Sequence, residues 1–465
     1  MFQNDKDRRT MLPRPPHRAR LRRNPARCLL LASLLFGIPA APMAAQAGAG
    51  ELGPLPNPMR VGDALERVDV LHPRVRQARA QREHARAELK ATRAERDVDL
   101  SARLEARWIE PNDRIENRSR NDSRASIVAR KLLSDFGQSH ARESASAQRL
   151  EAARMEEELA YARHRIHVLE RFFDVLLADL AFARDTEAMA AAFVSKERAE
   201  ERNQRGQVSD IEVFRLESEY QALRVQRTRA LQDQQRARAA LAEALNRPDR
   251  RVRTVLAPVL PLDLPALPDL DPLLAELDDT SPRLLAKRHH VEAATRELAA
   301  SRAQRHPRLY AEAESGWWQR DLGGGDRNPF AAGLVLEIPL YEGRRHDSRV
   351  GEAVAARHHA EARRGEARIE ARNRLRELHD EIRALKVQRD EAAWLMDYRE
   401  LYIDRARYLY DIEDQADLGD AMVQQSAAAH FNASTEFQLA LAYERLALLT
   451  GRDELSPFRA TDENA

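Results

Sequence analysis

The sequence predicts an internally duplicated α+β membrane protein, in which a strand pair followed by a long helical hairpin occurs twice. Three observations predict it: a two-residue alternation, its repeat later in the chain, and long helical runs. In Val98–Trp108 every even position is apolar, and four of the five odd positions are charged. Because a strand sends successive side chains to opposite faces, one face of this strand is apolar and the other ionic.

The second copy lies about two hundred residues later. Arg308–Trp318 shows a similar alternation, and the step from Trp108 to Trp317 is 209 residues, as is the step from Pro73 to Pro282. Strands with one apolar and one charged face suit a barrel wall between lipid and water. The alternative for a single such segment is an edge strand of a soluble sheet.

Each strand pair is followed by a run typical of a coiled coil. Residues 138–205 contain no Pro or Gly, and about 68 helical residues would reach roughly 100 Å. Apolar residues recur there at spacings of three and four, as in a coiled-coil seam; they are Ile166, Leu169, Phe173, Leu176, Leu180 and Ala183. The second run has a matching seam of Leu375, Leu378, Ile382 and Leu385. Ser209 is a suitable N-cap for the first returning helix.

The predicted boundaries follow from these patterns. The domain plan is a signal peptide (1–47), a first repeat (48–246), a Pro-rich linker (247–282), a second repeat (283–452) and a C-terminal tail (453–465). The predicted strands span about 98–108, 124–133, 307–318 and 330–340. The predicted hairpins span about 138–245, with a tip near 206–209, and about 344–449, with a tip near 411–417.

The N-terminal segment has the pattern of an export signal. Nine basic and two acidic residues precede or flank the apolar run Leu29–Ile38, and Ala45-Gln46-Ala47 offers a cleavage site. Since the chain carries +1 and this segment +7, the remainder carries −6, which predicts no nucleic-acid surface. The only cysteine, Cys28, would leave with the signal and is not placed as a lipoprotein cysteine. We therefore expect a location in the periplasm, in the outer membrane or outside the cell.

Four strands are too few to close a barrel, and membrane barrels have no free edges. Several chains must therefore share one barrel, and a trimer would give twelve strands.

This plan resembles the TolC-like outer-membrane efflux protein family over essentially the whole mature chain. Two matching motifs, Leu-Ser-Asp-Phe-Gly (133–137) and Leu-Tyr-Glu-Gly-Arg (340–344), stand where a strand enters a long helix. At the first tip, Gly206, Ser209 and Glu212-Val213-Phe214 resemble the family's tip motif. At the second, Asp417-Leu418-Gly419-Asp420-Ala421 is similar to the family's Asp-Leu-Leu-Asp-Ala, with Gly419 in place of Leu.

The resemblance implies a trimeric duct with a shared 12-stranded transmembrane β-barrel and a long periplasmic α-helical barrel. It would be the outer-membrane exit of a tripartite efflux pump or a type I secretion system. The implied partners are two further copies of the chain, a periplasmic adaptor (membrane fusion) protein, an inner-membrane RND or ABC transporter, and outer-membrane lipid. By the same resemblance, Gly206, Ser209, Glu212 and Gly419 are expected at the tips, in contact with a partner. The alternative is a periplasmic coiled-coil scaffold or adaptor without a channel.

Acidic residues gather at the second tip. By resemblance, Asp417 and Asp420 would ring the periplasmic aperture, and Asp411 and Asp414 are further candidates. Rings of carboxylates attract cations and can bind a multivalent cation. The alternative is a solvated acidic turn in which Asp414 or Asp417 caps the helix.

Other motifs predict no chemistry. Adjacent histidines on a helix point about 100° apart, so His289-His290 and His358-His359 are expected on solvated faces rather than at a metal. No nucleophile–base constellation is present, so we expect no enzyme and no cofactor. Trp108, Trp317 and Trp318 at strand ends fit an interfacial aromatic girdle, with burial under a loop as the alternative.

Overall fold

The structure, a computed structural model of the 465-residue chain, describes residues 55–68, 72–110, 120–248, 252–258, 264–318, 330–413 and 418–458. The chain divides into two units, residues 1–54 and 55–465, and every described residue belongs to the second. The predicted signal peptide lies outside the described residues. Within the described ranges, no helix has both the length and the apolar character needed to cross a membrane.

The described strands form one four-stranded sheet in the order β1-β2-β3-β4. They are β1 (Val98–Glu105), β2 (Arg124–Ser134), β3 (Arg308–Trp318) and β4 (Phe330–Glu337). Each strand is antiparallel to the next, and the two strand pairs of the duplicated sequence join through β2 and β3. β1 and β4 are therefore the edges of this sheet.

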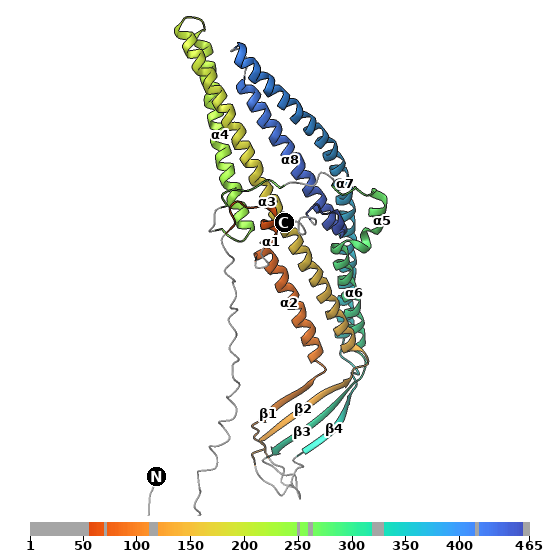
Figure 1. The fold of residues 1–465 in the computed structure, drawn as a ribbon. Coiled ribbons are helices and arrows are strands. Elements are labelled where there is room, and N and C mark those ends of the chain that lie inside the picture. The colour runs from red at the N-terminus through yellow and green to blue at the C-terminus, as the bar shows by residue number, and fades with distance from the viewer. Residues whose placement is uncertain are drawn as a thin grey trace, which may run out of the picture. The chain divides into compact units, whose positions relative to one another are not determined.

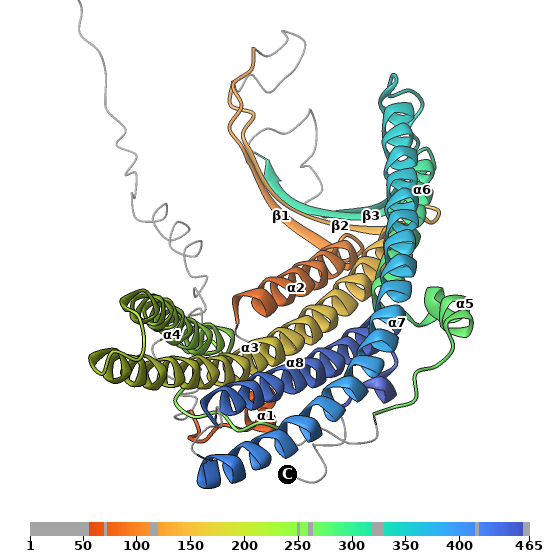
Figure 2. The ribbon, with the colours of Figure 1, turned by 90° about the horizontal axis from the view of Figure 1, so that it is seen from above.

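Two very long helices organise the rest of the unit. α3 (Gln138–Gln204) has 67 residues and α7 (Arg345–Glu413) has 69, so each is about 100 Å long at 1.5 Å per residue. α2 (Pro73–Ala94) and α6 (Pro282–Ala303) pack along their sheet-proximal halves, and α4 (Asp210–Ala244) and α8 (Leu418–Thr450) along their distal halves. The neighbours run α2-α3-α6-α7 near the sheet and α4-α3-α8-α7 toward the hairpin tips (Figures 1 and 2).

The predicted Pro-rich linker contains a helix that the sequence analysis missed. α5 (Leu270–Thr280) lies inside 247–282, and its Pro272 is the third residue of the helix. Proline is tolerated there because the first turn has no intrahelical partner for its missing N–H. Leu273 and Leu277 of this helix are buried against α7 and α8. The remaining short elements are α1 (Val61–Glu66) and the 3-10 helix η1 (Asp453–Leu455).

The buried core lies at mid-length of the long helices. Val168, Leu169 and Phe173 of α3 pack with α1, the end of α4 and Phe437 of α8. Phe173 and Phe437 stack with ring centroids 4.4 Å apart, a distance at which aromatic pairs attract. A second cluster, between α5, α7 and α8, includes the buried seam residues Leu375, Ile382 and Leu385.

The strand ends differ from the predicted ones by a few residues. β1 ends at Glu105 and β4 at Glu337, short of Trp108 and Leu340. Antiparallel pairing nevertheless continues beyond β1, since Trp108 forms a bridge with Asn121 and the Ile109 N–H donates to the Arg120 carbonyl at 2.9 Å. The difference is an interruption of the ladder rather than a change of register.

A tight corner connects β2 to α3. Phe136 and Gly137 have φ values of +52° and +102°, and glycine adopts such values without steric cost. The Asp135 carboxylate accepts a hydrogen bond from the Ser139 N–H at 2.7 Å, which satisfies a donor of the first helical turn. This corner sets the sheet against the end of the long helix.

Candidate functional site

One face of the sheet is apolar from edge to edge. The pairing register places Leu100 opposite Ala129, Ala129 opposite Ala313, and Ala313 opposite Ala332. Directly paired residues share a face, so the face also holds the following residues: Val98, Ala102, Leu104, Ala125, Ile127, Leu309, Ala311, Trp317, Phe330, Leu334 and Leu336. Lys131 is its single charged side chain.

This apolar face is open to its surroundings. Leu104 is 75% exposed and Leu334 is 68% exposed, and every residue of β4 is exposed. A contiguous apolar surface of this kind on a soluble monomer would mark an interaction site. The sheet therefore presents a surface suited to lipid or to a further protein layer.

The opposite face is ionic, and Arg130 and Arg124 pair with carboxylates of neighbouring strands. The Arg130 guanidinium lies 2.8 Å from a Glu312 oxygen and 3.4 Å from a Glu337 oxygen, and 3.7 Å from the ring centroid of Tyr310. One arginine thus joins β2 to both β3 and β4. Such pairs stabilise a water-facing surface by only about 0–1 kcal/mol each, but they fix which face meets water.

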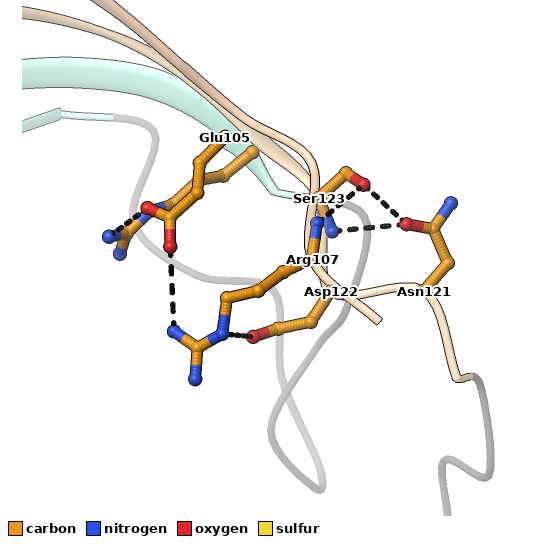
Figure 3. A network of polar contacts seen from close by, with 6 residues as sticks. Glu105, Arg107, Asn121, Asp122 and Ser123 are labelled. Carbon is orange, nitrogen blue, oxygen red and sulfur yellow. Dashed lines mark hydrogen bonds and ion pairs between the residues drawn. The ribbon is translucent and has the colours of Figure 1, made fainter. Parts of the chain in front are cut away.

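A second polar network stands where β1 and β2 leave the sheet (Figure 3). Arg107 contacts Glu105 at 3.7 Å and Asp122 at 3.6 Å, and the Arg124 guanidinium donates to Glu105 at 2.6 Å. The Arg107 N–H donates to the Ser123 hydroxyl at 3.4 Å. These contacts continue the ionic face beyond the end of β1.

The predicted girdle tryptophans occupy positions on both faces of the sheet. Trp108 and Trp317 are 74% and 60% exposed at the sheet end far from the helices. Position 317 pairs with Ala125, on the apolar face, whereas position 318 pairs with Arg124, on the ionic face. Phe330, also exposed, pairs with Ser315 near the same end. An interfacial role for these aromatic residues remains a prediction.

The first hairpin tip is a tight, internally bonded turn between α3 and α4. Gly206 has φ +70°, and its N–H donates to the Asn203 carbonyl at 2.8 Å. The Asn203 side-chain amide donates to the Val208 carbonyl at 2.9 Å and to Asp210 at 2.8 Å. Ser209 is the N-cap of α4, and its side chain makes no capping bond.

Exposed apolar side chains follow this turn. Ile211 is 82% exposed and Phe214 is 75% exposed. Glu212, which stands between them, pairs with Arg215 at 2.7 Å, and that hydrogen bond lowers the pKa of the Glu212 carboxyl. The tip thus exposes the apolar side chains of Ile211 and Phe214 beside a glutamate whose charge is compensated by Arg215.

Most of the acidic second tip lies outside the described side chains. Asp414 and Asp417 are outside the described residues, and Asp411 is described only as part of the α7 backbone. Asp420 is exposed in the first turn of α8 and accepts a hydrogen bond from Gln424. Gly419 lines a groove of about 270 Å³ with Ala190, Val194 and Met422.

The expectation of solvated His289 and His290 is wrong. Both are half-buried between α6 and α3, where the His289 ring bonds Gln148 at 2.6 Å and His290 bonds Glu156 at 3.1 Å. The bond from His290 lowers the pKa of Glu156. His358 and His359 are exposed as predicted. Among the described residues no cluster of His, Cys, Asp and Glu could hold a metal ion.

One buried histidine could not be predicted from the sequence. His164 of α3 is 1% exposed and stacks on His72, with ring centroids 3.9 Å apart. Burial, followed by the charges of His72, His167 and Arg74, lowers the pKa of His164 to about 4. Helical spacing cannot predict this contact, because His72 lies before α2 whereas His164 lies within α3.

Comparison with known proteins identifies the architecture. Residues 273–452 match the family model of outer membrane efflux proteins. No curated protein matches the chain. The predicted resemblance to outer membrane efflux proteins is thereby confirmed.

Solved outer membrane channels share the fold. The CmeC channel of Campylobacter jejuni aligns with a TM-score of 0.70 at 14% identity, over 84% of this chain and 85% of that one. VceC of Vibrio cholerae aligns with a TM-score of 0.66 at 18% identity, over 85% and 95%. The MtrE channel of Neisseria gonorrhoeae, in its open state, aligns with a TM-score of 0.63 at 17% identity, over 86% and 90%.

Proposed function

We propose that this protein is the trimeric outer-membrane exit duct of a tripartite efflux pump or type I secretion system. The observation that carries the proposal is the four-stranded sheet, which is apolar on one face, ionic on the other, and open at both edges. Such a sheet leaves backbone groups unsatisfied in lipid until its edges are paired.

Three copies would pair the open edges and would also place the two faces of the sheet toward lipid and toward water. Four strands from each copy give a closed barrel of twelve, with the apolar face toward lipid and the Arg130 network toward water. Within one chain the strands alternate in direction, so β1 and β4 run antiparallel to each other. The β4 edge of one copy therefore meets the β1 edge of the next in the same antiparallel pattern.

The long helices extend the duct into the periplasm. α4 and α7 end the helical layer near the tips, and α7 exposes Trp394, Leu401 and Tyr408 there. These side chains would be covered by a neighbouring copy in a closed helical barrel. The tips, with Ile211 and Phe214 exposed, would meet a periplasmic adaptor, and an inner-membrane RND or ABC transporter would supply the cargo.

The acidic tip remains part of this proposal. Three copies of Asp417 and Asp420, with Asp411 and Asp414 as further candidates, would ring the aperture and favour cations. In planar bilayers the open pore should then prefer cations, and a trivalent cation added from the tip side should block the current. Asp417→Ala/Asp420→Ala should weaken the block. Block that survived this double change would place the ring elsewhere.

Membrane extraction and mass determination test the duct directly. The protein should stay with outer membranes after a carbonate wash, and its detergent-solubilised form should have three times the mass of the processed chain. Release by carbonate would instead favour a periplasmic coiled-coil scaffold without a channel. A membrane-embedded monomer or dimer would contradict the shared barrel.

A further inference from the structure

A groove at mid-length of the helical layer lies outside the sheet and the tips. It has a volume of about 340 Å³ and opens between α3, α6, α7 and α8. Its lining includes five apolar side chains, which are Leu159, Ile166, Leu378, Leu448 and Leu449. Pockets of this size and apolar character are typical of small-molecule sites.

Arginines surround this apolar lining. Arg163, Arg283, Arg374 and Arg445 line the groove, against a single carboxylate, Glu170. Arg445 is neutralised by Glu170 at 2.6 Å, and Arg374 pairs with Glu377 at 3.0 Å. Arg283 pairs with Glu370. Arg163 makes no hydrogen bond or ion pair with any described residue.

The charge of Arg163 is unfavourably placed in the present structure. Desolvation by the surrounding helices lowers the pKa of its guanidinium, the positive Arg283 lowers the pKa further, and Glu156 opposes both effects. An anion bound beside Arg163 and Arg283 would offset their mutual repulsion.

A buried hydroxyl points to the same ligand. Ser281 is 0% exposed, lines the groove and is the N-cap of the 22-residue helix α6. Its hydroxyl makes no capping bond and has no hydrogen-bond partner among the described residues. A buried polar group without a partner is unfavourable, and a helix N-terminus favours an anion.

We propose that this groove binds an amphiphilic anion, with its monoanionic head at Arg163, Ser281 and the N-terminus of α6. The apolar body of the ligand lies against Leu159, Ile166 and Leu378. This site does not depend on the proposed duct, because every group in it belongs to one chain.

Calorimetric titration with decanoate tests the site, using the full chain transferred from detergent into a non-ionic amphipol, whose uncharged polymer favours neither probe. Decanoate supplies a carboxylate head and an apolar body, and decyltrimethylammonium is the probe of opposite charge. Decanoate should bind and decyltrimethylammonium should not. Arg163→Ala should weaken decanoate binding tenfold or more, because a hydrogen bond to a charged group contributes about 1.5–3 kcal/mol.

Two further variants separate binding from folding. Ser281→Ala should weaken decanoate binding severalfold with no fall in the unfolding midpoint, since its hydroxyl makes no capping bond. Arg154→Ala removes the same charge from the same helix at an exposed pair with Glu158 and should bind decanoate like the parent protein. Equal binding by all three variants, or equal binding of the cationic probe, would overturn the proposal.

Discussion

Gly451→Ala should be one of the most damaging single-methyl changes in the helical layer. Gly451 follows α8 with φ +68°, and a methyl group there would lie 2.4 Å from the Thr280 carbonyl oxygen and 3.2 Å from Pro282 Cδ. The first contact is with backbone at the junction of α5 and α6, which cannot rotate away as a side chain would. The end of α8 or this junction must therefore move.

The cost has two parts. A left-handed backbone costs a residue with a Cβ about 1–2 kcal/mol, and overpacking adds about 1–3 kcal/mol. Gly343 has nearly the same φ, +67°, with no atom within 4 Å of an added methyl group. Gly343→Ala should therefore lose only the first part, so the two variants should differ by about 1–3 kcal/mol.

Urea unfolding followed by circular dichroism at 222 nm measures this difference. Both variants should unfold at lower urea than the parent protein, with Gly451→Ala the lower of the two. Equal midpoints for the two variants would refute the close approach of α8 to the α5–α6 junction.

Three further predictions test the sheet, the buried histidine and the first tip. Leu100→Arg, at the middle of the apolar face, should impair membrane assembly, because arginine at mid-depth on a lipid face costs about 2–4 kcal/mol; Ser101→Arg, on the ionic face, should assemble, as heat-resistant oligomer on gels would show. His164, with its pKa of about 4, should contribute about 3 kcal/mol to a rise in the free energy of unfolding from pH 4 to pH 6.5, because the unfolded chain binds a proton there that neutral His164 does not. His164→Leu should reduce that rise by the contribution of His164 in pH-dependent urea titrations, while His167 and His430, whose pKa values are also lowered, supply part of the remainder. Asn203→Ala should destabilise the tip by about 1–2 kcal/mol, since it removes the bonds to Val208 and Asp210, and hydrogen exchange near residues 203–210 should accelerate while exchange in the sheet stays unchanged.

The sheet could be predicted from the sequence because apolar and charged residues alternate along its strands. Leu104 and Glu105 are neighbours in the chain and belong to opposite faces, so a period of two was sufficient. The end of β1 could not be predicted as accurately. The alternation continues to Trp108, whereas the ladder is interrupted after Glu105. The α5 helix could not be predicted because Pro272 lies among the other prolines of the linker, although proline is compatible with a first turn.

The groove and the histidine contacts could not be predicted in the same way. Arg163, Ser281 and Leu449 come from three helices, and no periodicity connects residues so far apart in the chain. The sequence of α6 alone shows only that the adjacent side chains of His289 and His290 diverge. Their partners, Gln148 and Glu156, lie on α3, and such contacts follow only from tertiary packing.

The open edges of β1 and β4 also make the chain prone to aggregation before it assembles. A single copy carries two unpaired strand edges beside an exposed apolar face, a combination that invites aggregation. The chain would thus need a holding chaperone until these edges are paired, while its helices, whose backbone hydrogen bonds are local, form early. In refolding from urea, the helical signal should return at a rate independent of protein concentration, whereas heat-resistant oligomer should appear faster as the concentration of chains is raised.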